Sequence, residues 1–277
     1  MKDIGIVTFL LIAANGLVTY KGLKSFTYRR KYAFDVDQIL GNKDYKRLIT
    51  SGFLHVDWRH FFFNMLTLYF FSGSLEGSLG VPVFLVLYFA SLVGGNLLAL
   101  YFHRNHLDYR AVGASGAVSG LVFASIGLYP GLEIGFILFP IFFPAWIYGI
   151  GYVLYSIYGI KSHRDNIGHE AHLGGGIVGL LVAIMFYPNI MVINTFPIAL
   201  ILIPSLVFLI LIIKIPHILM VDKPFGKPKG NQTIEDKYNT IKLSKQSELD
   251  NILDKINTQG LDKLTQHEKD RLKELSK

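Results

Sequence analysis

The sequence predicts an all-α, polytopic membrane helical bundle, with a six-helix core and a seventh span after it. Of the 277 residues, 51% are hydrophobic and only 17% are charged, a composition typical of membrane proteins. Several stretches of about 20 residues carry no charge, and a helix of that length crosses ~30 Å of hydrocarbon. Charged residues concentrate instead in positions 222–277. A membrane body with a soluble tail is therefore expected.

Apolar runs between charged residues and Pro or Gly breaks give the spans in order. The first run, 4–20, has no small-residue cleavage site before the basic stretch that follows, so we expect a retained span rather than a signal peptide. The last run carries Pro197 and Pro204 and is expected to be tilted or kinked. The runs between them are 58–75, 81–102, 113–129, 144–160 and 171–187, followed by the last at 190–213.

Two segments of the body do not fit a simple span or connector. Residues 21–57 mix charge with aromatic side chains and are too long for a plain loop, so we expect them to pack as an interfacial structure of their own. Residues 134–143 are too short to span and are interrupted by Pro140.

The domain organisation follows from composition. Residues 1–220 are expected to form the transmembrane domain, 221–243 a linker rich in Pro, Gly and Lys, and 244–277 a small soluble helical hairpin. Gly260 is expected to end the first tail helix, and Thr265 with Glu268 forms a capping-box pattern before the second. The first tail helix has an apolar stripe at Leu249, Ile252, Leu253 and Ile256.

Polar residues gather at the start of three spans, where an ionisable side chain costs about 2 to 3 kcal/mol on insertion. The second span begins HVDWRHFFFN, which places His60 and Asn64 four residues apart on one helix face. The fourth span begins with Ser115 among glycines, and the sixth has His172 just inside it. Each group alone is explained by structure, since glycines permit helix packing and buried polar residues form satisfied pairs.

Taken together, the three groups favour catalysis. A serine hydroxyl is a weak nucleophile that needs an adjacent base, and His172 is set in a later span beside glycines. Close approach of the two helices would bring Ser115 and His172 within hydrogen-bond reach. The small residues that would allow it are Gly116 and Gly120 on one helix and Gly175 and Gly179 on the other.

Attack on a peptide carbonyl also creates an oxyanion, which needs preorganised donors worth about 3 kcal/mol each in the transition state. Ser115, at the start of a helix, offers its own free backbone N–H. The side chains of His60 and Asn64 are candidates for two further donors.

At these residues the chain resembles the rhomboid intramembrane serine proteases, of the bacterial type with a six-helix core, an added C-terminal span and a small soluble tail. The resemblance rests on HVDWRHFFFN, GSLEGSLG, GASG and AHLGGGIVG, in that order between about residues 52 and 187. It implies Ser115 as the nucleophile, His172 as general base and then acid, and His60, Asn64 and the Ser115 amide as the oxyanion hole. The implied reaction is hydrolysis of transmembrane segments of membrane proteins through an acyl-enzyme, without cofactor or metal.

One position departs from the resemblance. Some family members place an aromatic residue four positions after the serine, where it stacks on the catalytic histidine. Here that position is Ser119, so the sequence names no residue that orients His172.

Peptide carbonyls inside a transmembrane helix are shielded by internal hydrogen bonds. We therefore expect substrates whose helices are weakened by Gly, Ala, Ser or Pro near the membrane surface.

Three other functions compete with proteolysis. The first is a metal-dependent protease. HEAH at 169–172 is, however, one residue shorter than the zinc motif HExxH, and no Cys and no obvious carboxylate inside a span offers a third ligand. A catalytically silent rhomboid-like scaffold that binds membrane proteins is the principal alternative, although such relatives typically lack the serine or the histidine. A transporter would show inverted repeats, and none is seen.

The basic residues set the expected partners and leave the orientation open. Lys and Arg outnumber acidic residues 27 to 20, but they flank the spans, where anionic lipid is a simpler partner than nucleic acid. With seven spans these basic loops share one face, which the positive-inside rule places in the cytoplasm. The resemblance suggests the opposite, since family members usually cleave on the outer side. We expect a multi-pass integral protein of the bacterial inner membrane.

Overall fold

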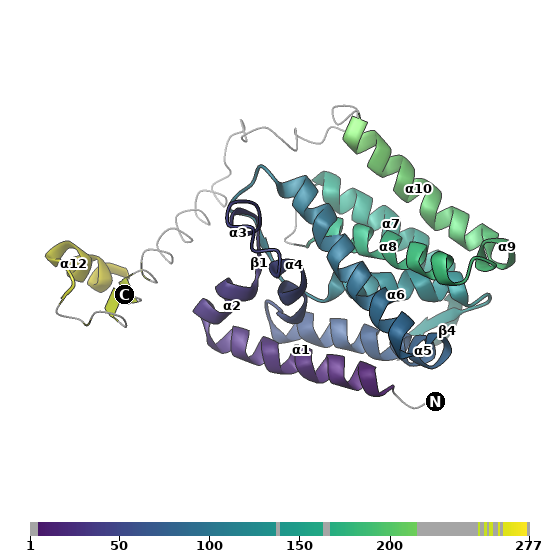
Figure 1. Cartoon of the computed structure of the whole chain (residues 1–277), viewed down its shortest axis with the longest axis horizontal. Helices are drawn as coiled ribbons and strands as arrows, with labels where there is room; N and C mark the ends of the chain where they lie inside the picture. Colours follow the sequence, from purple (N-terminus) through teal and green to yellow (C-terminus); the bar gives the residue numbers. More distant parts are fainter. Residues whose placement is uncertain are drawn as a thin grey trace. The chain divides into compact units, whose positions relative to one another are not determined.

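The computed structural model describes residues 5–136, 139–162 and 167–214, together with part of 249–275. The chain forms two compact units, Met1–Phe225 and Gly226–Lys277, and each is described by itself. The predicted linker, 221–243, lies outside the described residues. The helices of the first unit, drawn in Figure 1, are α1 (Ile6–Lys24), α2 (Phe26–Tyr32), α3 (Val36–Leu40), α4 (Arg47–Thr50), the 3-10 helix η1 (Ser51–Phe53), α5 (Trp58–His103), α6 (Ser115–Leu128), α7 (Ala145–Ser162), α8 (His169–Phe186), α9 (Ile190–Ile193) and α10 (Thr195–Lys214).

Every predicted span coincides with helix, so the all-α polytopic bundle is confirmed. Among the described residues, α1, α5, α8 and α10 are long and apolar enough to cross a membrane, and α6 is a shorter apolar helix. The interruption in the last span falls at Asn194, between α9 and α10, rather than at either proline. Its side-chain amide donates to the carbonyls of Ile126 at 2.7 Å and Gly127 at 3.2 Å, so it caps the end of α6.

The long α5 is two helices that join at Gly80, where φ is 73° and ψ is 159°. A residue with a Cβ rarely adopts this conformation, and glycine does so without steric cost. His60, near the start of α5, lies beside Gly113, and Gly95, near its end, lies against Ala171. Both contacts are at the Ser115 end of α6, so the two halves of α5 run in opposite directions.

Helix α6 is the centre of the bundle, and nearly all of its residues are buried. It packs on α8 through glycines on both helices. A Cβ added to Gly175 would overlap the backbone of Gly116, and one added to Gly179 would overlap the backbone of Gly120. Such close backbone approach gives the dispersion contacts that hold membrane helices together, because lipid offers no hydrophobic drive between them. The predicted small-residue contact is confirmed.

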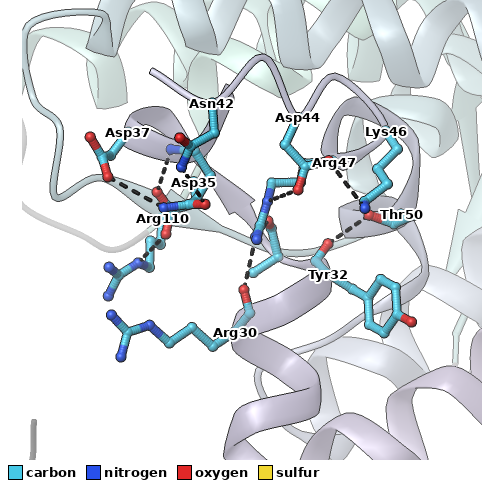
Figure 2. A network of polar contacts seen from close by, with 12 residues as sticks. Arg30, Tyr32, Asp35, Asp37, Asn42, Asp44, Lys46, Arg47, Thr50 and Arg110 are labelled. Atoms are coloured by element: carbon cyan, nitrogen blue, oxygen red, sulfur yellow. Dashed lines mark hydrogen bonds and ion pairs between the residues drawn. The ribbon is translucent and has the colours of Figure 1, made fainter. Parts of the chain in front are cut away.

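Of the predicted segment 21–57, residues 21–24 complete α1, and the rest forms a compact structure of short helices and one strand. Strand β1 (Phe34–Asp35) pairs antiparallel with β2 (Arg110–Ala111), just before α6. Figure 2 shows the polar network that holds this region. Arg47 donates from Nε to Asp44 at 2.9 Å and from Nη1 to the carbonyls of Arg30 and Ala33, both at 2.8 Å. A small apolar core beneath the network consists of Phe34, Val36, Ile39, Leu48 and Ala99.

A buried carboxylate fixes the start of α1. Glu76, on the first half of α5, accepts hydrogen bonds from the backbone N–H of Val7 at 3.0 Å and of Thr8 at 2.9 Å. The Thr8 hydroxyl donates to it at 2.7 Å. The first N–H groups of a helix have no partner within the helix, and a negative charge there is stabilised by the helix dipole. Glu76 therefore ties α1 to α5.

The segment 134–143, too short to span, belongs to a β-hairpin. Strand β3 (Glu133–Phe136) pairs antiparallel with β4 (Phe139–Pro144), and the register is irregular between Gly135 and Phe136. The hairpin connects α6 to α7.

In the second unit, the described residues agree with the predicted helix ends. Gly260 has a φ of +87° and its N–H donates to the Ile256 carbonyl at 2.9 Å, the geometry of a glycine that ends a helix. Helix α12 (Gln266–Leu275) follows a capping box: the Thr265 N–H donates to Glu268 at 2.7 Å, and the Glu268 N–H donates to the Thr265 hydroxyl at 3.3 Å. The stripe residue Ile252 is buried.

Candidate active site

Ser115 is the first residue of α6, and the chain reaches it through a turn that requires glycine at position 113. Gly113 has a φ of +144°, in the region that residues with a side chain rarely adopt. Its N–H donates to the Ser51 carbonyl at 3.1 Å, which holds this turn against η1. Ser115 itself is half-buried. Its backbone N–H belongs to the first turn, where no intrahelical acceptor exists.

His60 lies beside Ser115, and Gly113 is what separates them. A point where Gly113 would carry its Cβ is 3.1 Å from His60 Nε2 and 3.6 Å from Ser115 Oγ. The two side chains therefore lie on the same side of Gly113. The ring is presented by the first turn of α5, which Asp57 caps by accepting from the His60 N–H at 2.8 Å. That bond lowers the pKa of Asp57.

Asn64 follows one turn after His60 and is buried. Its Nδ2 donates to the His60 carbonyl at 3.0 Å, so the side chain turns back toward the start of its own helix. An amide nitrogen has a second hydrogen to donate. The prediction that His60 and Asn64 share a helix face is consistent with this contact.

The ring of His55 packs against the ring of His60. Its ring is fully buried, 5.0 Å from the His60 ring between centroids, and meets it edge to face. Nδ1 of His55 lies 2.9 Å from the Thr19 hydroxyl of α1. Burial lowers the pKa of His55 to about 3, with a smaller contribution from His60, so this imidazole is neutral at physiological pH.

His172 lies in the first turn of α8 and is half-buried. Its N–H donates to the Gly168 carbonyl at 3.1 Å. The chain neighbours of the two candidate catalytic residues meet: the Ala171 carbonyl oxygen is 3.2 Å from the point where Gly116 would carry a Cβ. The start of α8 is thus held against the start of α6.

The rings of His169 and His172 in HEAH meet edge to face at 6.0 Å, and each HEAH side chain also has a neighbour outside the motif. Glu170 lies 3.4 Å from Nε2 of His103, the ring of His169 meets Tyr155 edge to face, and His172 stacks on Tyr152. In the part of the chain that the structure describes, no three His, Cys, Asp or Glu side chains form a group that could hold a metal ion.

Two residues that sequence reasoning missed lie at this site. Asp57 could have been found, because an acidic residue just before an apolar helix is a standard N-cap signal. Tyr152 of α7 had only a weak signal, the spacing of Tyr148, Tyr152 and Tyr155 in an apolar run. Its ring centroid is 5.8 Å from that of His172, with 24° between the planes.

Comparison with known families places most of the body in one domain type. Residues 42–189 match the rhomboid domain, and residues 232–277 match a family of unknown function, DUF6576. The chain is 29% identical over 197 residues to RHOMBOID-like protein 12, mitochondrial, of Arabidopsis thaliana, a match that covers 65% of this chain and 58% of that protein. It is 31% identical over 165 residues to Rhomboid protein 1, mitochondrial, of Saccharomyces cerevisiae, covering 57% and 46%.

A further relative is RHOMBOID-like protein 1 of Arabidopsis thaliana, 33% identical over 166 residues, with 60% of this chain and 40% of that protein covered. The chain thus spans about half the length of the curated relatives it matches.

Proposed function

This chain belongs to the rhomboid family, and on that premise we propose that it is an intramembrane serine endopeptidase that cleaves transmembrane segments of other membrane proteins. Ser115 Oγ attacks the peptide carbonyl while His172 accepts the hydroxyl proton. His172 then protonates the leaving amine, which breaks the C–N bond and leaves an acyl-enzyme. A water molecule, deprotonated by His172, then attacks the ester carbonyl. The bond from the acyl carbon to Oγ breaks, His172 gives its proton to Ser115 Oγ, and the new carboxyl end leaves.

The observation that carries this proposal is the arrangement around Gly113. His60 Nε2 and Ser115 Oγ lie 3.1 and 3.6 Å from the position that a Cβ on Gly113 would take, so a donor and a nucleophile lie on the same side of this glycine. In the proposed reaction, a carbonyl group attacked by Ser115 Oγ develops negative charge next to the imidazole of His60 and the backbone N–H of Ser115. The Asn64 amide, one turn further along α5, is the third donor of the proposed oxyanion hole.

The second support is the glycine contact between α6 and α8. It fixes the relative depth of the two helices through backbone atoms, which have no rotamers to change. Ser115 precedes Gly116 directly, and His172 precedes Gly175 by three residues, so both candidates lie within one turn of that contact. Proximity of nucleophile and base is what the proposed chemistry requires.

The proposed substrates are transmembrane proteins whose helices carry Gly, Ala, Ser or Pro near the membrane surface, where carbonyls become accessible. The chain itself is a multi-pass membrane protein in contact with lipid. The first two relatives described above carry the word mitochondrial in their names. They do not support the expected location in a bacterial inner membrane.

A fluorophosphonate probe tests the proposal on full-length protein in proteoliposomes. We expect the wild type to be labelled at Ser115, as located by mass spectrometry, and to cleave a model transmembrane substrate. Ser115→Ala and His172→Ala should lose both activities while keeping the thermal transition of the wild type. Ser125→Ala is the matched control, because Ser125 is a buried serine of the same helix that only donates to the Leu121 carbonyl at 2.9 Å.

A folded wild type that is neither labelled nor active would contradict the protease proposal and favour the catalytically silent scaffold. Replacing helix-weakening residues of the substrate by Leu should slow cleavage. Equal rates on both substrates would contradict the proposed substrate preference alone.

A further inference from the structure

The ring of Tyr152 stacks on His172, which the His169 ring also meets edge to face, and Tyr152 comes from a different helix than the nucleophile. The two rings are nearly parallel, at 24°, with centroids 5.8 Å apart. Tyr152 lies in the middle of α7, whereas Ser115 begins α6 and His172 lies in the first turn of α8. One side chain of α7 thus reaches the proposed base from outside the α6–α8 pair.

The hydroxyl of Tyr152 is fixed at its other end by α6. Its Oη lies 2.8 Å from Ser119 Oγ, and Ser119 Oγ donates to the Ser115 carbonyl at 2.7 Å. A serine hydroxyl has one proton, so Ser119 gives it to the Ser115 carbonyl and accepts from Tyr152. The contacts run from the backbone of Ser115 through Ser119 and Tyr152 to the ring of His172.

Apolar packing also holds the Tyr152 ring. Phe123 of α6 meets it edge to face at 5.9 Å, and Tyr148, one turn earlier on α7, stacks on it at 5.8 Å and 23°. Ser119 is buried, so its hydroxyl needs a partner inside the protein. A large ring with a bonded hydroxyl at one end and packing on both sides has little rotational freedom.

We propose that Tyr152 is a positioning residue whose ring fixes the imidazole plane of His172, and that packing against Phe123, assisted by the bond to Ser119, holds the ring in the stacking position. This inference rests on the proposed function, because it concerns the orientation of the base in that reaction. It assigns to α7 and Ser119 together the orienting role for which α6 carries no aromatic residue at position 119. General base catalysis requires the accepting nitrogen to face the hydroxyl, so a freely rotating ring spends less time in the productive orientation.

The experiment compares Tyr152→Leu with Tyr152→Phe and with Tyr158→Leu in proteoliposomes. Tyr152→Leu removes the aromatic ring while keeping an apolar side chain, and we expect kcat to fall about 10- to 100-fold with KM unchanged. Tyr152→Phe keeps the ring and should retain at least one third of kcat. Tyr158→Leu is the matched control, since Tyr158 is an exposed tyrosine of the same helix, and kcat should change less than threefold.

A spectroscopic measurement separates positioning from loss of folding. In detergent-solubilised protein with isotope-labelled histidine, the ring protons of His172 should show the ring-current shift of a stacked tyrosine. His172→Ala identifies the signal. Tyr152→Leu should abolish that shift and Tyr152→Phe should keep it.

The inference is overturned if Tyr152→Leu and Tyr152→Phe reduce kcat equally, if Tyr152→Leu raises KM alone, or if the His172 signal is unchanged in Tyr152→Leu. An active wild type with a fully active Tyr152→Leu variant rejects this inference and leaves the protease proposal intact. A wild type that the fluorophosphonate does not label rejects both, and the two failures are thereby told apart.

Discussion

The carboxylate of Asp35 accepts a 2.6 Å hydrogen bond from Nε of Arg110, 75 residues further along the chain. Asp35 is buried, and its second oxygen accepts from the Gln38 N–H at 3.2 Å as the cap of α3. The pair joins β1 to β2, and β2 ends two residues before Gly113. The compact structure of residues 21–57 is thus connected directly to the turn that presents Ser115.

We expect Asp35→Ala to lower the free energy of unfolding by about 1 to 3 kcal/mol, because it removes a cap and leaves Arg110 without its ion pair. Fluorophosphonate labelling of Ser115 should slow several-fold as the turn loosens. Thermal unfolding in detergent and the labelling rate measure the two effects. Asp37→Ala, an exposed neighbour, should change neither, and an equal effect of both substitutions would contradict the assigned role.

The buried guanidinium of Arg47 leads to a second prediction. Its side chain is 7% exposed and donates to the backbone carbonyls of Arg30 and Ala33, both at 2.8 Å. Arg47→Met should destabilise the protein by about 2 to 4 kcal/mol, since it leaves buried acceptors unsatisfied.

The adjacent Lys46 provides the control. Its side chain is 60% exposed and its ion pair with Asp44 spans 3.4 Å, so Lys46→Met should cost less than about 0.5 kcal/mol. Comparable losses in the two variants would show that the charge of this loop, rather than the buried bonds of Arg47, stabilises it.

The glycine contact between α6 and α8 predicts which glycine-to-alanine substitutions the bundle tolerates. Gly179→Ala would place a methyl group on the backbone of Gly120, so α8 must shift, and we expect about 1 to 3 kcal/mol of destabilisation with loss of labelling at Ser115. Gly151→Ala, in α7, meets no atom within 4 Å and replaces a helical glycine, so it should leave the thermal midpoint unchanged or raise it. A harmless Gly179→Ala would mean that the helices are not held by backbone contact.

The neutral, buried His55 predicts how stability depends on pH. Its pKa is lowered to about 3 in the folded protein by burial, against about 6.5 in the unfolded chain. Below pH 6.5 the unfolded chain therefore binds a proton that the folded protein does not, and stability falls as the pH drops from 6.5 toward 3. The slope from this residue is about 1.4 kcal/mol per pH unit.

His55→Asn keeps a polar group near Thr19 and removes the titrating imidazole. Unfolding by urea in detergent at pH 7.5, 6 and 5 should show a shallower pH dependence in the variant than in the wild type. Parallel curves would contradict the assignment of this slope to His55.

The body of the fold was predictable because lipid leaves few options. A charge-free run of about 20 residues can satisfy its backbone in hydrocarbon only as a helix, so hydropathy alone locates the spans. The paired glycines likewise indicate where helices touch. The roles of Arg47 and Asp35 were not predictable, because a charged residue in a long loop is read as solvated unless its partners, here 14 and 75 residues away, are known.

The candidate site likewise contains residues that the sequence indicates and one that it does not. Ser115, His172, His60 and Asn64 lie in motifs whose polarity is conspicuous in apolar surroundings, and the sequence points to them directly. Tyr152 is one of several tyrosines in α7, and the sequence gives no reason to choose one of them over the others. Which of them faces His172 depends on the rotation of α7 about its axis, and this is set by packing against α6 and α8 rather than by local sequence.

The length of α6 has a consequence for how the protein meets bilayers of different thickness. Its 14 residues extend about 21 Å, less than the ~30 Å of a typical hydrocarbon layer. Because α6 is enclosed by protein, lipid tails cannot stretch or tilt it to match. A thicker membrane would therefore bury the serine end further below the headgroups and lengthen the route of solvent to it, while the spacing between α6 and α8 stays the same.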